Sequence, residues 1–130
     1  MSVLDASAFI NSSEVLTGKH ITSPKVVLEI KDDKSKLLLE YSLSQGFLEI
    51  KSPKKSFLEI IKKKAKEIGS FHKLSEADLE VLALALEYGQ DIITDDYTIQ
   101  NVAAFLKIAF HPVSFKPIVK KRKFKIPPRS

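Results

Sequence analysis

The 130-residue sequence contains no cysteine and no tryptophan, and it has only four glycines. Without cysteine there is no disulfide framework and no thiolate ligand for a zinc ion. So few glycines, each standing alone, exclude a glycine-rich phosphate-binding loop. No apolar run approaches the roughly 20 residues that cross a bilayer. The opening MSVLDASAF also lacks the basic and long apolar regions of a secretory signal peptide, so we expect a cytoplasmic protein.

The composition is that of one soluble globular domain followed by a basic tail. Apolar residues make up 44% of the chain and charged residues 28%, and the length suffices for a single core. We expect the domain in residues 1–115 and a tail in residues 116–130. The tail has no acidic residue and seven basic ones: Lys116, Lys120, Lys121, Arg122, Lys123, Lys125 and Arg129.

This uneven charge predicts a polyanionic partner. Lys120, Lys121, Arg122 and Lys123 are the candidates for contact with RNA phosphates. Prolines in the tail disfavour a regular helix, so a disordered solubilising end is an equal alternative. A second basic cluster, residues 51–66, could also be an ordinary solvated helix face.

Short apolar runs alternate with helical patterns along the whole body of the chain. Extended segments are expected at residues 2–5, 19–23, 47–52, 91–96 and 108–113. Helical segments are expected at residues 6–16, 24–32, 33–46, 54–69, 74–89 and 97–107. Such alternation predicts an α/β fold with a mainly parallel sheet and right-handed crossovers.

The segment 74–89 is the clearest helix in the sequence. Ser75 and Asp78 have the spacing of a capping box, and Gly89 follows the last apolar residue as a helix end requires. One face should be apolar, formed by Leu79, Leu82, Ala83 and Leu86.

Two other segments carry more specific expectations. In residues 33–46, Leu37, Leu38, Tyr41 and Gln45 have helical spacing, and Gly46 follows as a helix end requires. Residues 47–52 alternate, which predicts a strand with one inward row. Three scattered histidines lack the spacing of metal ligands and are expected at the surface or in loops: His20, His72 and His111.

Acidic residues stand at the edges of several apolar runs: Asp5, Glu29, Asp78 and the pair Asp95 and Asp96. A carboxylate in such a run is costly to bury unless it is paired or binds a metal. In open parallel sheets, ligands bind beyond the carboxyl ends of the strands. Asp5 and the Asp95–Asp96 pair follow strands, and the other two acids could face the same edge from helices. Oxygen donors suit hard divalent cations, so the pattern indicates a shared metal site.

Each acid also has a simpler explanation. Asp78 could serve only as a helix-start residue favoured by the helix dipole. Asp95 or Asp96 could cap the following helix, and Glu29 could face solvent. Asp5 has no helix end that clearly requires it. Ser7 could orient a ligand or a water, or cap a helix itself.

Four segments together resemble the acidic motifs of PIN-domain ribonucleases: VLDASAFI, VVLEI, LSEADLEVLALALE and IITDDYTIQNVAAFLKI. They stand in the family's order and cover most of residues 1–111. The stretch TDDYTIQNVA is similar to the Nob-type endonucleases, which mature the 3′ end of small-subunit ribosomal RNA. The resemblance implies a three-layer α/β/α fold with a central, mainly parallel sheet. It also implies cleavage of single-stranded RNA that depends on Mg²⁺ or Mn²⁺.

The same resemblance assigns roles to individual residues. It implies catalytic acids at Asp5, Glu29, Asp78 and Asp96. Metal ligands would be Asp5, Asp78 and Asp96, with Asp95 as an alternative or auxiliary ligand. Tyr97, Gln100 and Asn101 follow the acid pair and could contact RNA, although Tyr97 could equally pack. The implied partners are a small-subunit ribosomal RNA precursor and the pre-ribosomal particle.

Three alternatives stay open from the sequence. Nob-type proteins usually continue into a zinc ribbon with paired cysteines. Either this sequence ends before such a ribbon, or the basic tail takes over its contact with RNA. The chain could instead be a VapC-like toxin ribonuclease held by an antitoxin. It could also be a non-catalytic RNA-binding module of an assembly.

Overall fold

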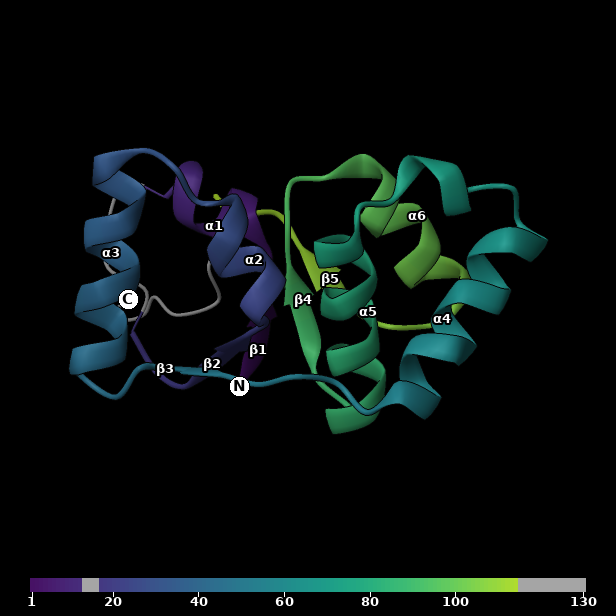
Figure 1. Cartoon of the computed structure of the whole chain (residues 1–130), viewed down its shortest axis with the longest axis horizontal. Helices are drawn as coiled ribbons and strands as arrows, with labels where there is room; N and C mark the ends of the chain where they lie inside the picture. The colour runs from purple at the N-terminus through teal and green to yellow at the C-terminus, as the bar shows by residue number, and fades with distance from the viewer. Residues whose placement is uncertain (13–16, 115–130) are drawn as a thin grey trace, which may run out of the picture.

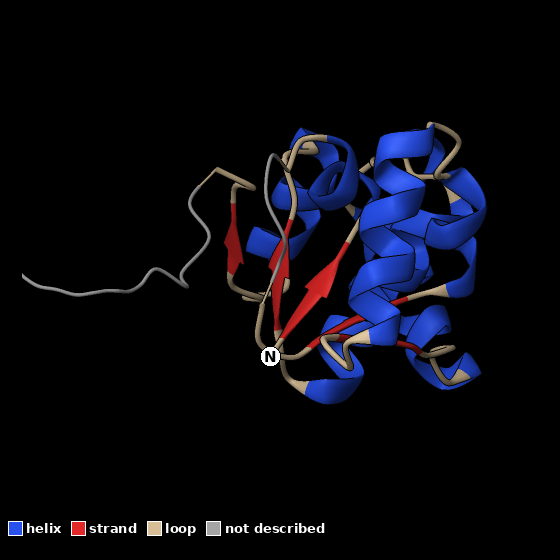
Figure 2. Ribbon diagram, turned by 90° about the vertical axis from the view of Figure 1, so that its left-hand side faces the viewer, coloured by secondary structure: helices blue, strands red, loops and turns tan. Residues whose placement is uncertain are grey.

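The computed structural model describes residues 1–12 and 17–114. The four tail residues expected to bind phosphates, Lys120 to Lys123, lie outside these described residues. Within the described ranges, five strands form one sheet in the order β3-β2-β1-β4-β5. All neighbouring strands run parallel, and the strands seen clearly in Figure 2 point the same way. The strands are β1 (Ser2–Leu4), β2 (His20–Thr22), β3 (Leu48–Ile50), β4 (Asp91–Ile93) and β5 (Phe110–His111).

Helices flank this sheet, which confirms the three-layer α/β/α architecture. They are α1 (Ala6–Ile10), α2 (Pro24–Glu29), α3 (Asp33–Ser44), α4 (Lys55–Glu67), α5 (Glu76–Tyr88) and α6 (Tyr97–Phe105), with a short 3₁₀ helix η1 (Phe71–Lys73). Figure 1 shows α3 at one end of the molecule and α4 at the other, with α5 between them. Helix α5 packs on β1 and β4 and has α2 and α4 as its neighbours. In the described part of the chain, no helix is long and apolar enough to cross a membrane.

Helix α5 begins and ends as its sequence predicts. The Ser75 hydroxyl accepts from the Asp78 amide, and the Asp78 carboxylate accepts from the Ser75 amide, so the capping box is confirmed. Gly89 ends the helix with a positive φ of 62°, a conformation that costs glycine little. Buried residues lie all around α5 rather than on one face, including Val81, Leu84 and Ala85. This helix is covered on several sides, because it lies between the sheet and two other helices.

The core lies along the two central strands and α5. Val3, Ile92 and Leu82 are fully buried, and Phe9 from α1 is the bulkiest fully buried side chain. Burying such a side chain stabilises the fold by about 1.5–3 kcal/mol. The rigid centre therefore fixes the positions at which β1 and β4 end.

Helix α3 forms where the sequence predicts it, but not every apolar residue at helical spacing in it is buried. Leu37 and Tyr41 are 66% and 48% exposed, and the buried side chains in this helix are Ser35, Leu39 and Ser42. The Ser35 hydroxyl donates to the carbonyl oxygen of Phe9 at the end of α1. Small serines bring α3 close to its neighbours, a signal that a search for large apolar residues overlooks.

Three expectations need correction. His20 is not a surface residue but is buried in β2 at 7% exposure, with Nε2 2.8 Å from the carbonyl oxygen of Thr17. Strand β3 has no full inward row, since Leu48 is buried but Ile50 is 42% exposed. A strand at the edge of a sheet has fewer neighbours to cover its side chains. Helix η1 falls where no element was expected.

Candidate active site

Asp5 stands where β1 ends and α1 begins, and it is the N-cap of that helix. The expectation that no helix end requires it was therefore wrong. One carboxylate oxygen accepts from the Ala8 amide at 3.2 Å and from the Ser7 hydroxyl at 2.7 Å. The other accepts from the Thr94 hydroxyl. The residue is only 4% exposed, so its carboxylate is fixed in place and largely removed from water.

The hydroxyl groups of Ser7 and Thr94, which bind Asp5, also hold the loop that follows β4. The Thr94 hydroxyl donates to Asp5 and accepts from the Asp96 amide at 2.9 Å. The Ser7 hydroxyl likewise donates to Asp5 and accepts from the Asp95 amide at 2.9 Å. Because β1 and β4 are parallel neighbours, their carboxyl ends meet at one edge. The two hydroxyls hold the Asp95–Asp96 backbone against Asp5.

The two neighbouring acids in this loop, Asp95 and Asp96, have different hydrogen-bond partners. Both carboxylate oxygens of Asp95 are engaged: one accepts from the Asn11 side-chain amide and the other from the Val113 backbone amide, each at 2.8 Å. Asp96 is the N-cap of α6 and uses one oxygen, Oδ1, to accept from the Thr98 and Ile99 amides. Asp95 thus connects α1 to the segment after β5. Asp96 keeps a carboxylate oxygen for which no protein donor is seen among the described residues.

Asp78 and Glu29 approach from the neighbouring helices. Asp78 lies in the first turn of α5, and Glu29 is the last residue of α2, exposed to solvent. Burial raises the pKa of Asp78, and the negative charges of Asp96 and Glu29 raise it further. The capping hydrogen bonds with Ser75 act in the opposite direction. The two acids are therefore close enough to Asp96, or to each other, for their charges to interact.

Burial also raises the pKa of Asp5, to about 6. The hydrogen bonds from Ser7, Thr94 and the Ala8 amide lower it, and the charge of Asp96 raises it. Asp96 thus repels both Asp5 and Asp78. Acids from four separate segments are thus linked by charge repulsion, which a bound cation would relieve.

The chemistry of these donors fits a hard divalent cation. All four are carboxylates, the oxygen ligands that Mg²⁺ and Mn²⁺ prefer. Within the described residues, no three His, Asp or Glu side chains form a ready-made metal-binding group. Mg²⁺ often uses only one or two carboxylates and completes its shell with waters and substrate phosphate. The arrangement therefore suits an ion held jointly by protein, water and substrate.

The residues expected to contact RNA are only partly described. Tyr97, at the start of α6, is 80% exposed and does not pack in the core. Asn101 is exposed one turn further along the same helix. Gln100 is engaged, because its side-chain amide donates to the Thr94 carbonyl oxygen at 2.9 Å. The basic residues 120–123 lie beyond the described part of the chain.

Sequence reasoning missed how Thr94 and Asn11 contribute. Thr94 is fully buried and donates to Asp5 across 89 positions of the sequence, and Asn11 orients Asp95. A hydroxyl residue directly before an acid pair at a strand end was the available signal for Thr94. Nothing in the local sequence distinguishes Asn11 from an ordinary residue at a helix end.

Comparison with known proteins identifies the family of the chain. A family model described as "PIN domain of ribonuclease" matches residues 2–88. Endoribonuclease Nob1 of Pyrococcus abyssi is 42% identical over 120 residues, which cover 91% of this chain and 73% of that protein. Endoribonuclease Nob1 of Methanocaldococcus jannaschii is 39% identical over 119 residues, covering 90% of this chain and 58% of that protein.

A third relative carries a different name. Ribonuclease VapC1 of Thermoplasma acidophilum is 37% identical over 119 residues, covering 91% of this chain and 60% of that protein. The chain thus spans less than two thirds of the length of two of these three relatives. The family model includes Asp5, Glu29 and Asp78 but ends before the Asp95–Asp96 pair. Together with the relatives, it confirms the family resemblance seen in the motifs. The chain belongs to the PIN-domain ribonuclease family.

Proposed function

We propose that this protein is a metal-dependent endoribonuclease that cleaves single-stranded RNA. The observation that carries the proposal is the meeting of Asp5, Asp78 and Asp96 at one sheet edge, where the charge of Asp96 raises the pKa of both other acids. Burial is the main cause of both raised pKa values, and neighbouring carboxylates with raised pKa values are typical of functional sites. Membership of a ribonuclease family supports RNA as the substrate.

In this proposal Asp5 and Asp96 hold Mg²⁺ or Mn²⁺ directly. Three hydrogen bonds reach Asp5, and a carboxylate has about four acceptor positions, so one remains for a ligand. Asp78 and Glu29 complete the shell or position the attacking water. A bound divalent ion would polarise the phosphate and lower the pKa of a bound water. Asp95 serves instead to fix the loop, because Asn11 and Val113 already occupy its oxygens.

The proposed substrate is precursor small-subunit ribosomal RNA, cut at its 3′ end within the pre-ribosomal particle. Relatives named endoribonuclease Nob1 support this choice. A protein of Schizosaccharomyces pombe named 20S-pre-rRNA D-site endonuclease nob1 is 30% identical over 102 residues, or 76% of this chain and 26% of that protein. Tyr97, Asn101 and the basic residues 120–123 would bind the RNA, and their phosphate contacts would weaken as salt rises.

A cleavage assay tests the proposal. A precursor RNA spanning the mature 3′ end is incubated with the protein and Mg²⁺ or Mn²⁺, and separately with chelator. We expect a cut near that end which requires the metal and is lost in Asp5→Asn, while RNA binding is kept or strengthened. RNA binding without any cleavage would instead favour a non-catalytic RNA-binding module. Unchanged cleavage by Asp5→Asn would remove Asp5 from the chemistry.

A toxin-type ribonuclease controlled by an antitoxin is the second candidate. Ribonuclease VapC3 of Aeropyrum pernix is 43% identical over 110 residues, covering 80% of this chain and 79% of that protein. The second candidate predicts a co-encoded small protein that inserts a basic side chain among Asp5, Asp78 and Asp96 and stops cleavage. Expression of the chain alone would then arrest growth, whereas the ribosomal candidate predicts no such arrest.

A further inference from the structure

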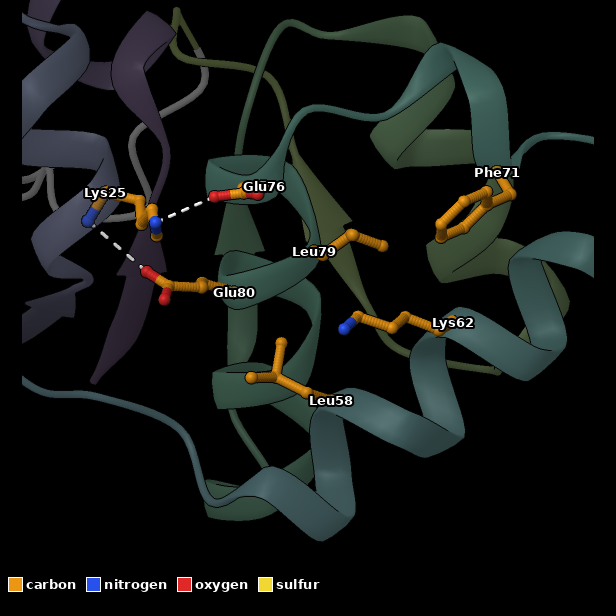
Figure 3. Close-up of a pocket in the computed structure, with 7 residues that line it drawn as sticks. All are labelled: Lys25, Leu58, Lys62, Phe71, Glu76, Leu79 and Glu80. Carbon is orange, nitrogen blue, oxygen red and sulfur yellow. Dashed lines mark hydrogen bonds and ion pairs between the residues drawn. The ribbon is translucent and has the colours of Figure 1, made fainter.

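The structure also has a pocket that the proposed chemistry does not use. It has a volume of about 330 Å³ and lies among α2, α4, η1 and α5, as Figure 3 shows. Its lining consists of Lys25, Leu58, Lys62, Phe71, Glu76, Leu79 and Glu80. We call it the α4–α5 pocket.

The α4–α5 pocket combines apolar walls with a charged rim. Leu58, Leu79 and the ring of Phe71 supply apolar and aromatic surface. The rim carries two lysines and two glutamates, so its formal charges cancel. A pocket of this kind suits a flat, neutral, partly apolar group with polar edges. It is less suited to an isolated phosphate, which its carboxylates would repel.

The rim on the α2 side is fixed by contacts across the helices. The Lys25 ammonium lies 2.7 Å from the Glu76 carboxylate, and the Lys25 backbone amide donates to Glu80 at 3.3 Å. Figure 3 shows both interactions. Each carboxylate has further acceptor positions beyond the one used here. The two glutamates can therefore accept from a ligand while they hold α2 against α5.

On the opposite side of the rim, Lys62 is held by a longer ion pair than Lys25 is. Lys62 extends from α4 over the pocket toward α5 (Figure 3). The only carboxylate within ion-pair distance in the described structure is Glu59, at a loose 3.7 Å. Lys62 can therefore turn to a phosphate at the edge of the pocket without breaking a strong ion pair.

The pocket and the acid site share two helices. Glu76 and Asp78 both belong to the first turn of α5, and Lys25 and Glu29 lie one turn apart on α2. The pocket and the acids thus lie beside the same helices, and the proposal requires that an RNA strand bound at the acids continue along them to the pocket.

We propose that the α4–α5 pocket binds one purine base of the RNA strand next to the cleaved phosphate, with guanine preferred. This inference rests on the proposed endoribonuclease function. The volume accommodates a purine, and base stacking on an aromatic side chain is a general means of binding single strands. Guanine presents an N1–H and a 2-amino group side by side, which one carboxylate, that of Glu80, can accept together. Lys62 holds the phosphate attached to that nucleotide.

The test compares pocket variants with matched variants outside the pocket. Lys62→Gln is paired with Lys63→Gln, the same charge change on the adjacent residue, and Phe71→Leu is paired with Phe105→Leu on α6. Each protein is assayed for binding and cleavage on a short RNA of defined cut site and on the same RNA with an abasic nucleotide at each flanking position. Thermal unfolding of every variant shows whether it remains folded.

The pocket predicts one flanking position at which base removal weakens the wild-type interaction about 5-fold or more. That penalty should disappear in Phe71→Leu and persist in Phe105→Leu. Replacing guanine by inosine at this position should weaken the wild type and leave Glu80→Gln unaffected. If Lys62→Gln and Phe71→Leu show the same abasic profile as their controls while cleavage persists, the pocket binds no base and the nuclease function stands. If the wild type cuts no RNA with either metal, both proposals fall.

Discussion

Two helix starts in this protein are built alike and behave in opposite ways. Asp5 caps α1 and Asp32 caps α3, and each accepts from the backbone amide three residues further on, at 3.2 Å and 2.9 Å. Burial raises the pKa of Asp5 to about 6. The hydrogen bonds with Ser35 lower the pKa of Asp32. The same local structure thus occurs with one carboxyl group whose charged form is disfavoured and with another whose charged form is favoured.

The difference lies in what surrounds each cap. Asp32 stands in solvent, where capping alone stabilises the charged form. Asp5 stands at the carboxyl edge of the sheet, buried beside Thr94 and repelled by Asp96. A cap required only for the helix gains nothing from that position. The comparison therefore distinguishes a capping acid buried among other acids from a capping acid that stands in solvent.

The largest expected effect concerns cleavage. Asp5→Asn and Asp96→Asn should each reduce the cleavage rate by at least about 100-fold, because even the partners of metal ligands contribute roughly 10- to 100-fold. Asp32→Asn keeps a capping oxygen and should cleave like the wild type. Single-turnover rates at saturating RNA make the comparison. Equal losses in all three variants would indicate unfolding rather than chemistry.

The next effect concerns stability against pH, measured in chelator. The folded pKa of Asp5 lies above its unfolded value of 3.8, so the native state binds the extra proton and is weakened as pH rises through about 6. Asp5→Asn should therefore gain up to about 3 kcal/mol in unfolding free energy over the wild type between pH 4 and pH 7.

Asp32 provides the control, because its pKa is shifted in the opposite direction to that of Asp5. Its folded pKa is lowered, so its contribution is present above the unfolded pKa and is lost as pH falls through the folded value. Asp32→Asn should thus lose stability relative to the wild type at neutral pH and match it in acid. Urea unfolding at several pH values measures both variants. The same slope for both would contradict the assignment of Asp5 to a strained, buried position.

A smaller effect distinguishes Asp95 from Asp96. Asp95→Ala removes the bonds to Asn11 and Val113 and should cost about 1–3 kcal/mol of stability. Asp96→Ala removes a helix cap and should cost about 1 kcal/mol. Cleavage should follow the reverse order, with Asp96→Ala inactive and Asp95→Ala retaining most activity. An inactive but well-folded Asp95→Ala would make Asp95 a ligand instead.

The smallest effect belongs to the tail. Replacing Lys120, Lys121, Arg122 and Lys123 by glutamine should leave cleavage at saturating RNA unchanged. Each lost phosphate contact should reduce the slope of log affinity against log salt by about 0.7. Filter binding at several salt concentrations gives that slope. An unchanged slope would remove these residues from RNA binding.

Much of this architecture follows from local signals in the sequence. The capping box at Ser75 and Asp78, the stop at Gly89 and the strand–helix alternation all depend on neighbouring residues, and the structure has each of them. The buried residues of α3 are harder to predict, because Ser35 and Ser42 are buried alongside Leu39 while Leu37 is exposed. His20 was placed at the surface because its neighbours in the sheet are distant in sequence.

The candidate site, too, could be predicted from the sequence only in part. The acids could be identified because each follows or opens an apolar run. Their separate roles could not be predicted, because these roles depend on long-range contacts such as that of Asn11 with Asp95, which are 84 positions apart. The capping role of Asp5 was missed since α1 is only five residues long, too short for a clear periodic pattern.

Direct titration with Mn²⁺ tests whether these acids form one cation site. Calorimetry or electron paramagnetic resonance would compare the wild type with Asp5→Asn, Asp78→Asn, Asp96→Asn and Asp32→Asn. A shared site predicts saturable binding that weakens at least about 10-fold in each of the first three variants and is unchanged in Asp32→Asn. Binding that is equal in all five proteins would show that the acids at the sheet edge hold no common ion.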